Sequence, residues 1–339
     1  MGEPLVSAVI ITYNQEQYIK QTIECALAQK VDFDYEIVIG EDCSTDKTRE
    51  ICLQYQEKYP DIIRVITSDK NVGLLDNWYR SVNAAKGKYI AGCGGDDYWH
   101  NSNKIQKQAQ FLEKNKDYGM VHSNAYVLYE NKNTLYHKIA KNIEPVNFNK
   151  QTLILNQLIA GTVIAGTVMF KKKFFDNYYN IEELKENGIC IEDGPLWLEI
   201  SARSKTYYLP EMFLTYRALH GSISTPTSII KKIEFHQSCY KCMLYYYKKF
   251  IQKIDQPEQI LKLIHWHYNI WIFNLAFESG DITLSRNCYN NIIMLVGASY
   301  LKDRDKVRFY LTYLPYSQKL FLFLKKLAFL RKIKSSFWL

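Results

Sequence analysis

The sequence predicts an α/β protein with a mostly parallel sheet flanked by helices and a helical region toward the C-terminus. Short β-branched runs alternate with helix-like segments over residues 6–93, and this alternation is typical of βαβ units. With 47% hydrophobic and 23% charged residues, the composition is that of a globular chain. From about residue 228 the pattern becomes helical and rich in tyrosine.

Strands and helices are expected in strict alternation at the start of the chain. β-Branched and other apolar residues predict strands at 6–12, 35–40, 62–67 and 88–93. Apolar residues recur at helical spacing at 15–29, 44–59 and 74–86. Ser44, Thr45 and Asp46 can cap the second of these helices, and Pro60 ends it.

After the fourth strand the alternation is less regular. The pattern predicts a helix at 101–115, an extended strand at 118–130, a polar connection at 131–148 and a second apolar stretch at 159–170. The change to a helical, aromatic composition places a domain boundary near residue 225.

The formal net charge of +8 is concentrated at the C-terminal end. Residues 302–339 hold ten basic and two acidic side chains, so the rest of the chain is balanced. A nucleic-acid-binding protein more often spreads basic residues over its binding face. We therefore expect no nucleic-acid partner.

The eight cysteines are scattered and lack the spacing of a secreted disulfide framework, which favours a reducing compartment. Cys239 and Cys242 are expected to pack within a helix, because no second pair accompanies them to bind zinc. The N-terminus lacks a signal-peptide pattern, and no run of about 18 apolar residues occurs. These features predict a cytoplasmic protein.

Polar and acidic residues follow the predicted strands. In open α/β sheets, ligands bind beyond the carboxyl ends of the strands, so these residues are the first candidates for a site. They are Thr12, Tyr13 and Asn14 after the first strand, Glu41 and Asp42 after the second, Asn71 after the third, and Asp96 and Asp97 after the fourth. The three-glycine dinucleotide fingerprint and the phosphate loop are missing, so a nucleotide would be held in another way.

Asp96 and Asp97 follow two glycines, and adjacent carboxylates are costly unless a cation lies between them or water reaches them. A divalent cation bridging a diphosphate would satisfy them, because Mg²⁺ and Mn²⁺ prefer oxygen ligands. The alternative is a solvated acidic pair at a helix N-terminus, where the helix dipole favours negative charge. The pair alone leaves both interpretations open.

Five ordered segments resemble family 2 glycosyltransferases of the GT-A fold. They are VSAVIITYN, EIVIGEDCSTDKT, NVGLLDNWYRSVNAAKGKYIAGCGGDDYW, IEDGPLWLEI and YLPEMFLTYRALHGSIS. The resemblance spans about residues 5–225 and implies a Rossmann-like GT-A catalytic domain at 1–225. Its nucleotide-sugar half would be about 1–100 and its acceptor half about 101–225. A helical domain at 226–315 and a tail at 316–339 would follow.

The resemblance assigns a set of residues to the nucleotide-sugar site. They are Thr12, Tyr13, Asn14, Glu41, Asp42, Asn71, Asp96 and Arg217. Tyr13 would stack near the base, and Asp42 would accept hydrogen bonds from the uracil or ribose. Arg217 would bind phosphate through its fork of donors, with a structural ion pair as the alternative.

The same resemblance implies a Mn²⁺ or Mg²⁺ ion on Asp97, with Asp96 contacting ribose or metal. Many relatives carry an acidic residue at the position of Gly94, so this chain has one carboxylate fewer. His220 matches a position near the diphosphate and metal, and a neutral imidazole suits Mn²⁺ better than Mg²⁺. The alternative for His220 is an ordinary histidine of a surface loop.

Inverting transfer needs a general base that takes the proton of the acceptor hydroxyl while the sugar is attacked opposite its diphosphate. The resemblance assigns this role to Asp193. It places Glu192, Trp197, Gly166 and Thr167 on the acceptor side. From the residues alone, Glu192 and Asp193 also fit an acidic helix N-terminus, and Trp197 fits the core.

The tail at 316–339, YSQKLFLFLKKLAFLRKIKSSFWL, mixes leucine and phenylalanine with lysine and arginine. A basic amphipathic helix of this kind fits an anchor on an anionic membrane surface. Packing on the catalytic domain or on another subunit is the alternative. Family members with such tails commonly extend lipid-linked oligosaccharides, which implies a peripheral location on the inner face of the plasma membrane.

The resemblance therefore implies an inverting enzyme that moves a sugar from a UDP-sugar to a saccharide or lipid-linked oligosaccharide acceptor in surface polysaccharide biosynthesis, as for capsule or lipopolysaccharide. A sugar nucleotidyltransferase is disfavoured, because TYNQEQYIK replaces the Gly-, Arg- and Lys-containing loop that it needs. A catalytically decayed scaffolding protein remains an alternative, supported by Gly94. Whether the chain forms a homo-oligomer stays open.

Overall fold

The fold is described from a computed structural model, in which the described residues are 2–129, 134–138, 163–219, 221, 228–254, 256–297 and 303–313. The chain divides into two compact units, Met1–Ser222 with Lys241–Asp255, and Ile223–Tyr240 with Gln256–Leu339. The first unit contains the sheet, and the described part of the second is helical. His220 and the predicted tail at 316–339 lie outside the described residues.

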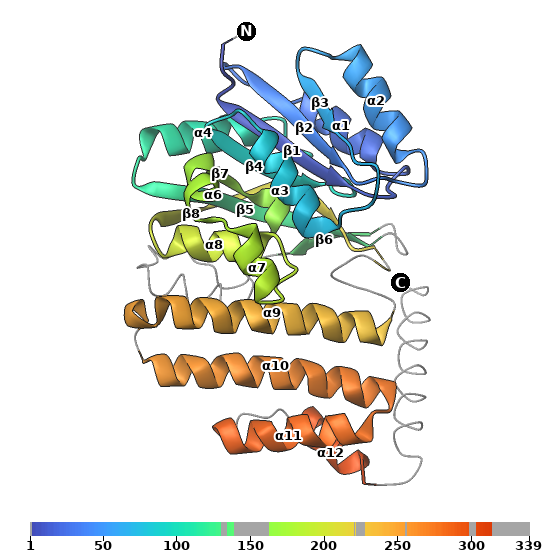
Figure 1. The fold of residues 1–339 in the computed structure, drawn as a ribbon, viewed down its shortest axis with the longest axis vertical. Helices are drawn as coiled ribbons and strands as arrows, with labels where there is room; N and C mark the ends of the chain where they lie inside the picture. Colours follow the sequence, from blue (N-terminus) through green and yellow to red (C-terminus); the bar gives the residue numbers. More distant parts are fainter. Residues whose placement is uncertain are drawn as a thin grey trace, which may run out of the picture. The chain divides into compact units, whose positions relative to one another are not determined.

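An eight-stranded sheet forms the centre of the first unit (Figure 1). Its strands are β1 (Val6–Thr12), β2 (Tyr35–Glu41), β3 (Ile63–Ile66), β4 (Tyr89–Gly94), β5 (Tyr118–Tyr129), β6 (Thr134–Lys138), β7 (Met169–Lys171) and β8 (Lys205–Arg217). Strand β1 lies between β2 and β4 and is parallel to both, and β3 pairs parallel with β2. This half of the sheet confirms the predicted α/β fold.

The other half of the sheet is mixed. Strand β7 pairs antiparallel with β4 and β5, whereas β8 pairs parallel with β5. The sequence pattern does not predict β8, because Pro210 and Glu211 interrupt its apolar residues and its pairing with β5 shifts register near Asn124. Neither does it predict β7, a three-residue strand at the end of the apolar stretch.

Helices cover both faces of the sheet (Figure 1). Those of the first unit are α1 (Ile19–Leu27), α2 (Thr48–Lys58), α3 (Leu74–Ala84), α4 (Lys104–Lys114), α6 (Lys172–Tyr178), α7 (Ile181–Glu186) and α8 (Asp193–Ser201). The first four lie where helical spacing predicts them, whereas the sequence pattern does not predict α6 and α7.

Alternation along β2 shows which helices cover which face. Ile37 and Ile39 share one buried cluster with Ile23 of α1 and Ile105 of α4. Gly40 points to the opposite face, because successive residues of a strand alternate in direction. A Cβ at Gly40 would lie 2.0 Å from Ser81 Oγ, so α3 packs on that face at a distance that only glycine permits.

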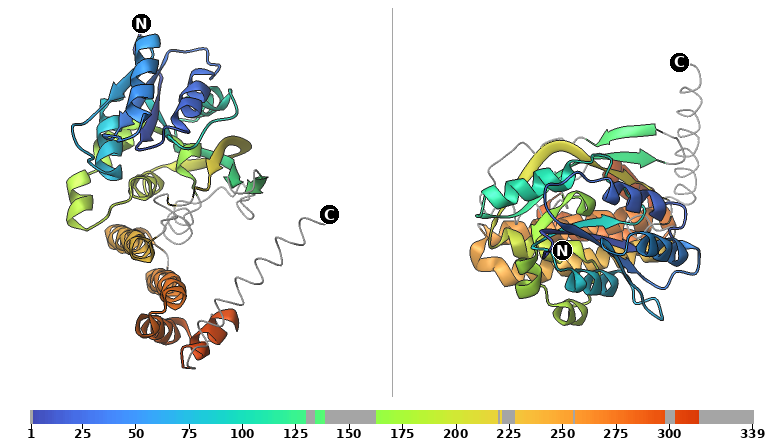
Figure 2. Two further views of the ribbon diagram at one scale, coloured as in Figure 1. Left: turned by 90° about the vertical axis from the view of Figure 1, so that its right-hand side faces the viewer. Right: turned by 90° about the horizontal axis from the view of Figure 1, so that it is seen from above.

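The second unit is built from helices. They are the first part of α9 (Ile229–Phe250), α10 (Pro257–Ser279), α11 (Ile282–Val296) and α12 (Asp303–Leu311). α10 and α11 lie side by side, and both are seen end-on in the left view of Figure 2. Phe273 and Tyr289 lie in the core, where Phe309 of α12 stacks on Tyr289 at a ring distance of 3.6 Å.

No described helix is both long enough and apolar enough to cross a membrane. None of the eight cysteines forms a disulfide, and Cys242 is buried in α9.

Candidate functional site

The carboxyl ends of β1, β2 and β4 meet at one edge of the sheet. The register pairs Thr12 with Glu41 on one side, and Ile11 with Gly94 on the other. The Asp42 amide continues this contact by donating to the Thr12 carbonyl at 3.1 Å. The predicted residues of three separate strands are therefore neighbours in space.

The loop after β1 is fixed by polar contacts with the loop after β2. Asn14 has a left-handed backbone (φ +52°), a conformation that asparagine tolerates better than most residues. Its amide donates to Ser44 Oγ at 3.0 Å, and its Oδ1 accepts from the Thr45 amide at 2.8 Å. Thr12 Oγ1 donates to Gln15 Oε1 at 2.8 Å, whereas Tyr13 is 44% exposed. Thr12 and Asn14 thus shape the loop, and the Tyr13 ring is accessible to a ligand.

Asp42 is buried and holds the turn before α3. Its two carboxylate oxygens accept from the amides of Val72 at 2.8 Å and Gly73 at 2.9 Å. Asn71 Nδ2 donates to the Asp42 carbonyl at 3.2 Å, which brings Asn71 to the end of β2. Gly73 has φ +89°, a conformation that side chains disfavour. Each carboxylate oxygen keeps a further lone pair through which a nucleotide could be recognised.

Glu41 is fully buried and is held by partners within the protein. It accepts from the Ser44 amide at 2.6 Å and from Arg49 Nε at 2.5 Å. Burial alone would raise the pKa of Glu41, but the hydrogen bonds from Ser44 and Arg49 outweigh it, so this pKa is lowered. These contacts give Glu41 a structural role that joins β2 to α2.

Residues 94–97, which we call the acid turn, begin at the last residue of β4. The Asp97 side chain is buried, and its Oδ1 accepts from the Arg217 amide at 2.8 Å. Its backbone carbonyl accepts from Thr22 Oγ1 at 2.6 Å. Burial and the neighbouring Asp96 raise the pKa of Asp97 well above its ordinary value, although Arg217 acts in the opposite direction. A cation at this position would relieve that cost.

Gly94 faces the two carboxylates of the acid turn. A Cβ at Gly94 would lie 2.9 Å from Asp96 Oδ1 and 3.9 Å from Asp97 Oδ2. An acidic side chain at this position would therefore project directly onto the pair. Across the described ranges no group of three or more His, Cys, Asp or Glu residues is arranged to hold a metal. Two carboxylates with oxygens from a diphosphate still suit a hard divalent cation, so these donors fit Mg²⁺ or Mn²⁺.

Arg217, at the end of β8, holds the acid turn from the other side. Its guanidinium carbon lies 4.9 Å from the ring centre of Tyr18 and 4.7 Å from that of Tyr98. It also donates to the Asp96 carbonyl and to Gln21 Oε1. These contacts place Arg217 beside the acid turn and orient its guanidinium.

Asp193 is the first residue of α8, and Glu192 precedes it. Both are half-buried, and Asp193 Oδ1 accepts from the Gly194 amide at 2.6 Å. Burial raises the pKa of Asp193, although the hydrogen bond from the Gly194 amide lowers it. Burial and the charge of Asp193 raise the pKa of Glu192 to about 8. The pair thus has the raised proton affinity that general bases need near neutral pH.

Trp197 joins α8 to the sheet. It is buried, and its ring contacts that of Phe170 edge-on at 5.6 Å. Phe170 lies in β7 and pairs with Ile90 of β4. The helix that carries Asp193 therefore packs on β7, which pairs with the strand that leads into the acid turn, and Trp197 has a core role.

Gly166 and Thr167, which are predicted to lie on the acceptor side, are buried in a 3₁₀ turn (Ala165–Thr167). The Gly166 carbonyl accepts from Trp99 Nε1 at 2.9 Å, and the Thr167 carbonyl accepts from Gln108 Nε2 at 2.8 Å. A Cβ at Gly166 would lie 2.8 Å from Leu214 Cδ2. The turn is thus held from within the protein.

Several side chains around the acid turn are not predicted from the sequence. Thr22, Gln21, Trp99 and Gln108 all contact it or the adjoining 3₁₀ turn. Of these, only Gln108 could have been found from the sequence. It lies one helical turn after Lys104 in a predicted helix, a spacing at which two side chains can contact each other.

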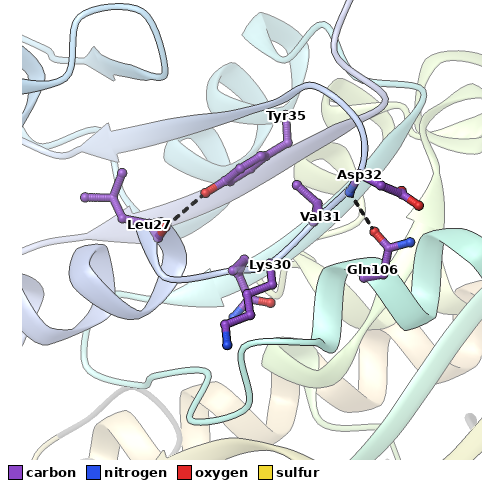
Figure 3. A pocket seen from close by; sticks show the side chains of 7 residues that line it. Leu27, Lys30, Val31, Asp32, Tyr35 and Gln106 are labelled. Atoms are coloured by element: carbon purple, nitrogen blue, oxygen red, sulfur yellow. Dashed lines mark hydrogen bonds between the residues drawn. The ribbon is translucent and has the colours of Figure 1, made fainter.

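A separate surface hollow of about 700 Å³ lies at the end of α1, where the chain enters β2 (Figure 3). The Tyr35 hydroxyl donates to the Leu27 carbonyl at 3.3 Å, and the Asp32 amide donates to Gln106 Oε1 at 3.1 Å. Tyr35 begins β2 whereas Glu41 ends it, so the hollow lies at the opposite edge of the sheet from the acid turn.

The sequence is similar to those of known proteins. A family model described as glycosyl transferase family 2 matches residues 7–179. The uncharacterized protein Rv1520 of Mycobacterium tuberculosis is 29% identical over 219 residues, which are 64% of this chain and 60% of that protein. The chain thus spans less than two thirds of that relative. TuaG of Bacillus subtilis, whose name proposes a glycosyltransferase role in teichuronic acid biosynthesis, is 27% identical over 227 residues, 66% of this chain and 82% of TuaG.

The fold has a counterpart among solved structures. S. aureus TarS 1–349, crystallised in complex with UDP-GlcNAc, matches with a TM-score of 0.53 and 16% identity. The match covers 93% of this chain and 92% of that one. This likeness confirms the predicted GT-A fold.

Proposed function

Because the chain belongs to glycosyl transferase family 2, we propose that it is an inverting glycosyltransferase that moves a sugar from a UDP-sugar to a saccharide hydroxyl. The observation that carries the proposal is the buried Asp97 beside Asp96, on the turn after β4 whose Gly95 amide donates to the Ile11 carbonyl of β1. The presence of UDP-GlcNAc in the TarS complex supports a UDP-sugar as donor.

The uridine would lie over the loops after β1 and β2. Tyr13 offers an exposed ring for stacking on the base. Asp42 and Asn71 lie together through the Asn71 Nδ2 contact and offer acceptors and donors for uracil or ribose. Thr12, Asn14 and Glu41 fix the shapes of these loops through Gln15, Ser44 and Arg49.

The diphosphate would lie at the acid turn. Asp97, with Asp96, would hold a Mg²⁺ or Mn²⁺ ion, which supplies positive charge that stabilises the departing UDP. His220, outside the described residues, is the third protein ligand that we propose. Arg217 orients the acid turn and adds positive charge beside the phosphates.

Asp193 would act as the general base. It takes the proton of the acceptor hydroxyl while that oxygen forms a bond to the sugar C1 and the bond from C1 to the diphosphate oxygen breaks. The raised pKa values of Asp193 and Glu192 support this assignment. Attack opposite the diphosphate inverts the configuration at C1.

The acceptor that we propose is a saccharide, lipid-linked, in the synthesis of a surface polysaccharide. The name of TuaG supports this substrate class. The basic and apolar residues at 316–339, whose structure is not described, would hold the enzyme at the anionic inner face of the plasma membrane.

Release of UDP from a panel of UDP-sugars, measured with Mn²⁺ and with EDTA, tests the proposal. We expect release only with Mn²⁺ or Mg²⁺, and loss of release in Asp97→Asn. Full turnover in EDTA would contradict the metal assignment. No turnover with any UDP-sugar on any saccharide acceptor would favour a decayed, sugar-binding relative.

A further inference from the structure

Lys104, near the start of α4, is a buried cation that the proposed mechanism does not use. Its side chain has no exposed surface, and its Nζ donates to Gln108 Oε1 at 2.8 Å. The Nζ also lies 4.3 Å from the ring centre of Trp99, which is a cation–π distance. The neighbouring residues Trp99, Ile105 and Ala109 belong to a buried hydrophobic cluster.

Such a lysine is costly for folding. Within the described part of the chain no carboxylate pairs with Lys104, and only one of its three donors has a hydrogen-bond acceptor. Burial lowers its pKa to about 7, which shows how weakly the surroundings support the charge. Methionine would fill the same space without this cost, so packing alone does not account for a lysine here.

The contacts of Lys104 fix two side chains that reach the 3₁₀ turn. Gln108 turns its Oε1 to Lys104, so its Nε2 must face the Thr167 carbonyl, to which it donates at 2.8 Å. A flipped amide would place Nε2 against the ammonium group and Oε1 against that carbonyl. Trp99, under the ammonium, donates from Nε1 to the Gly166 carbonyl at 2.9 Å.

These two contacts join the two parts of the proposed site. Trp99 follows the acid turn by two residues, and the neighbouring Tyr98 pairs with Thr215 of β8. The 3₁₀ turn leads directly into β7, on whose Phe170 the base-bearing helix α8 packs through Trp197. A shift of Gln108 or Trp99 would therefore change the position of Asp97 relative to Asp193.

We propose that Lys104 is a positioning residue. Through Gln108 and Trp99 it fixes the position of the acid turn relative to the 3₁₀ turn and β7, on which α8 packs. The inference rests on the proposed function for its effect on transfer. The predicted effect of Lys104 on the position of the acid turn does not depend on whether the protein transfers sugar.

The first test measures hydrogen exchange by mass spectrometry in Lys104→Met. The control is Lys107→Met, the same substitution on the same helix, at an exposed lysine that pairs with Glu211 at 3.0 Å on the surface. We expect faster exchange in peptides covering 94–99 and 163–171 in Lys104→Met only. Equal exchange in these peptides for both variants would overturn the proposal, whether or not the protein transfers sugar.

The second test measures transfer. In Lys104→Met we expect kcat to fall by about tenfold or more, with UDP affinity changed by no more than about twofold, because the loss concerns alignment and not donor binding. Trp99→Phe keeps an aromatic side chain but removes the donor to Gly166 and part of the buried ring, so it should also lower kcat, and it serves if Lys104→Met does not fold. The double variant should lose less than the sum of the two single losses. Full additivity, or kcat equal to that of Lys107→Met, would refute the positioning role.

Discussion

Replacing Asp97 with asparagine tests whether the acid turn is a cation site. Asp96 Oδ1 and Asp97 Oδ2 lie 2.9 and 3.9 Å from one point, the position of a Cβ at Gly94, so the two atoms are at most about 7 Å apart. Two ionised carboxylates at that separation repel by about 2.4 kcal/mol at an effective dielectric constant of about 20. Without a cation, this repulsion destabilises the folded protein.

Asparagine keeps the shape of Asp97 and an oxygen that can accept from the Arg217 amide, but it removes the charge. Because Asp96 is half-exposed and solvent screens part of the repulsion, we expect Asp97→Asn to raise the metal-free unfolding free energy by about 1–2 kcal/mol at pH 8. For a unit of this size, that corresponds to a rise in Tm of about 2–4 °C per kcal/mol.

The sign of the pH dependence follows from the raised pKa of Asp97. An acid whose pKa is higher in the folded state binds more protons there than in the unfolded chain. The wild-type protein should therefore lose stability as the pH rises from about 4, the unfolded value, through the folded pKa. Asp97→Asn lacks this contribution, so the difference in Tm should grow with pH.

Thermal unfolding in EDTA at pH 5 and pH 8, and again with Mn²⁺ and UDP, measures the effect. Mn²⁺ with UDP should raise the Tm of the wild-type protein and have little effect on Asp97→Asn. Asp117→Asn is the control, because the Asp117 carboxylate is exposed and pairs with Lys205 at the surface, and its Tm should match the wild type. A metal-free Asp97→Asn that unfolds at or below the wild-type Tm at pH 8 would refute the reasoning.

Three further predictions concern transfer and membrane contact. Asp193→Asn should abolish transfer and leave UDP affinity, measured by calorimetry, within about twofold; ordinary activity would contradict the base assignment. Because burial raises the pKa of Asp193, kcat/KM should increase with pH above the ordinary aspartate range as Asp193 loses its proton, and a flat profile from pH 5 would exclude Asp193 as the base. Deleting residues 316–339 should weaken sedimentation with anionic vesicles and spare transfer to a soluble acceptor, whereas unchanged sedimentation would assign the tail to protein packing.

The parallel half of the sheet could be predicted because its signals are local. Its strands are short runs of β-branched and other apolar residues, and polar residues that the open α/β fold brings to one edge follow them. Strand β8 could not, since Pro210 and Glu211 interrupt its pattern and its paired residues in β5 lie 86–89 positions earlier in the chain.

The side-chain partners at the site could not be predicted either, because the residues that contact each other lie far apart in the sequence. Asp97 accepts from Arg217, 120 positions later, and Asn14 contacts Thr45, 31 positions later. Residue types identify Asp97 as a candidate ligand, but only the fold shows that its carboxylate is buried and close to Asp96. Lys104 is the clearest case, because a lysine in an amphipathic helix is ordinarily exposed.

The buried and half-buried carboxylates of the first unit differ in how their burial is compensated. Hydrogen bonds from Ser44 and Arg49 outweigh burial at Glu41 and lower its pKa. At Asp97 and Asp193 the partners do not outweigh burial, and both pKa values are raised. Raised pKa values that no partner offsets are common at functional sites. Buried carboxylates whose partners offset the effect of burial are typical of structural pairs. A cation at Asp97 and an acceptor hydroxyl at Asp193 would each supply the missing partner, and a metal-bound UDP-sugar with a saccharide acceptor brings both.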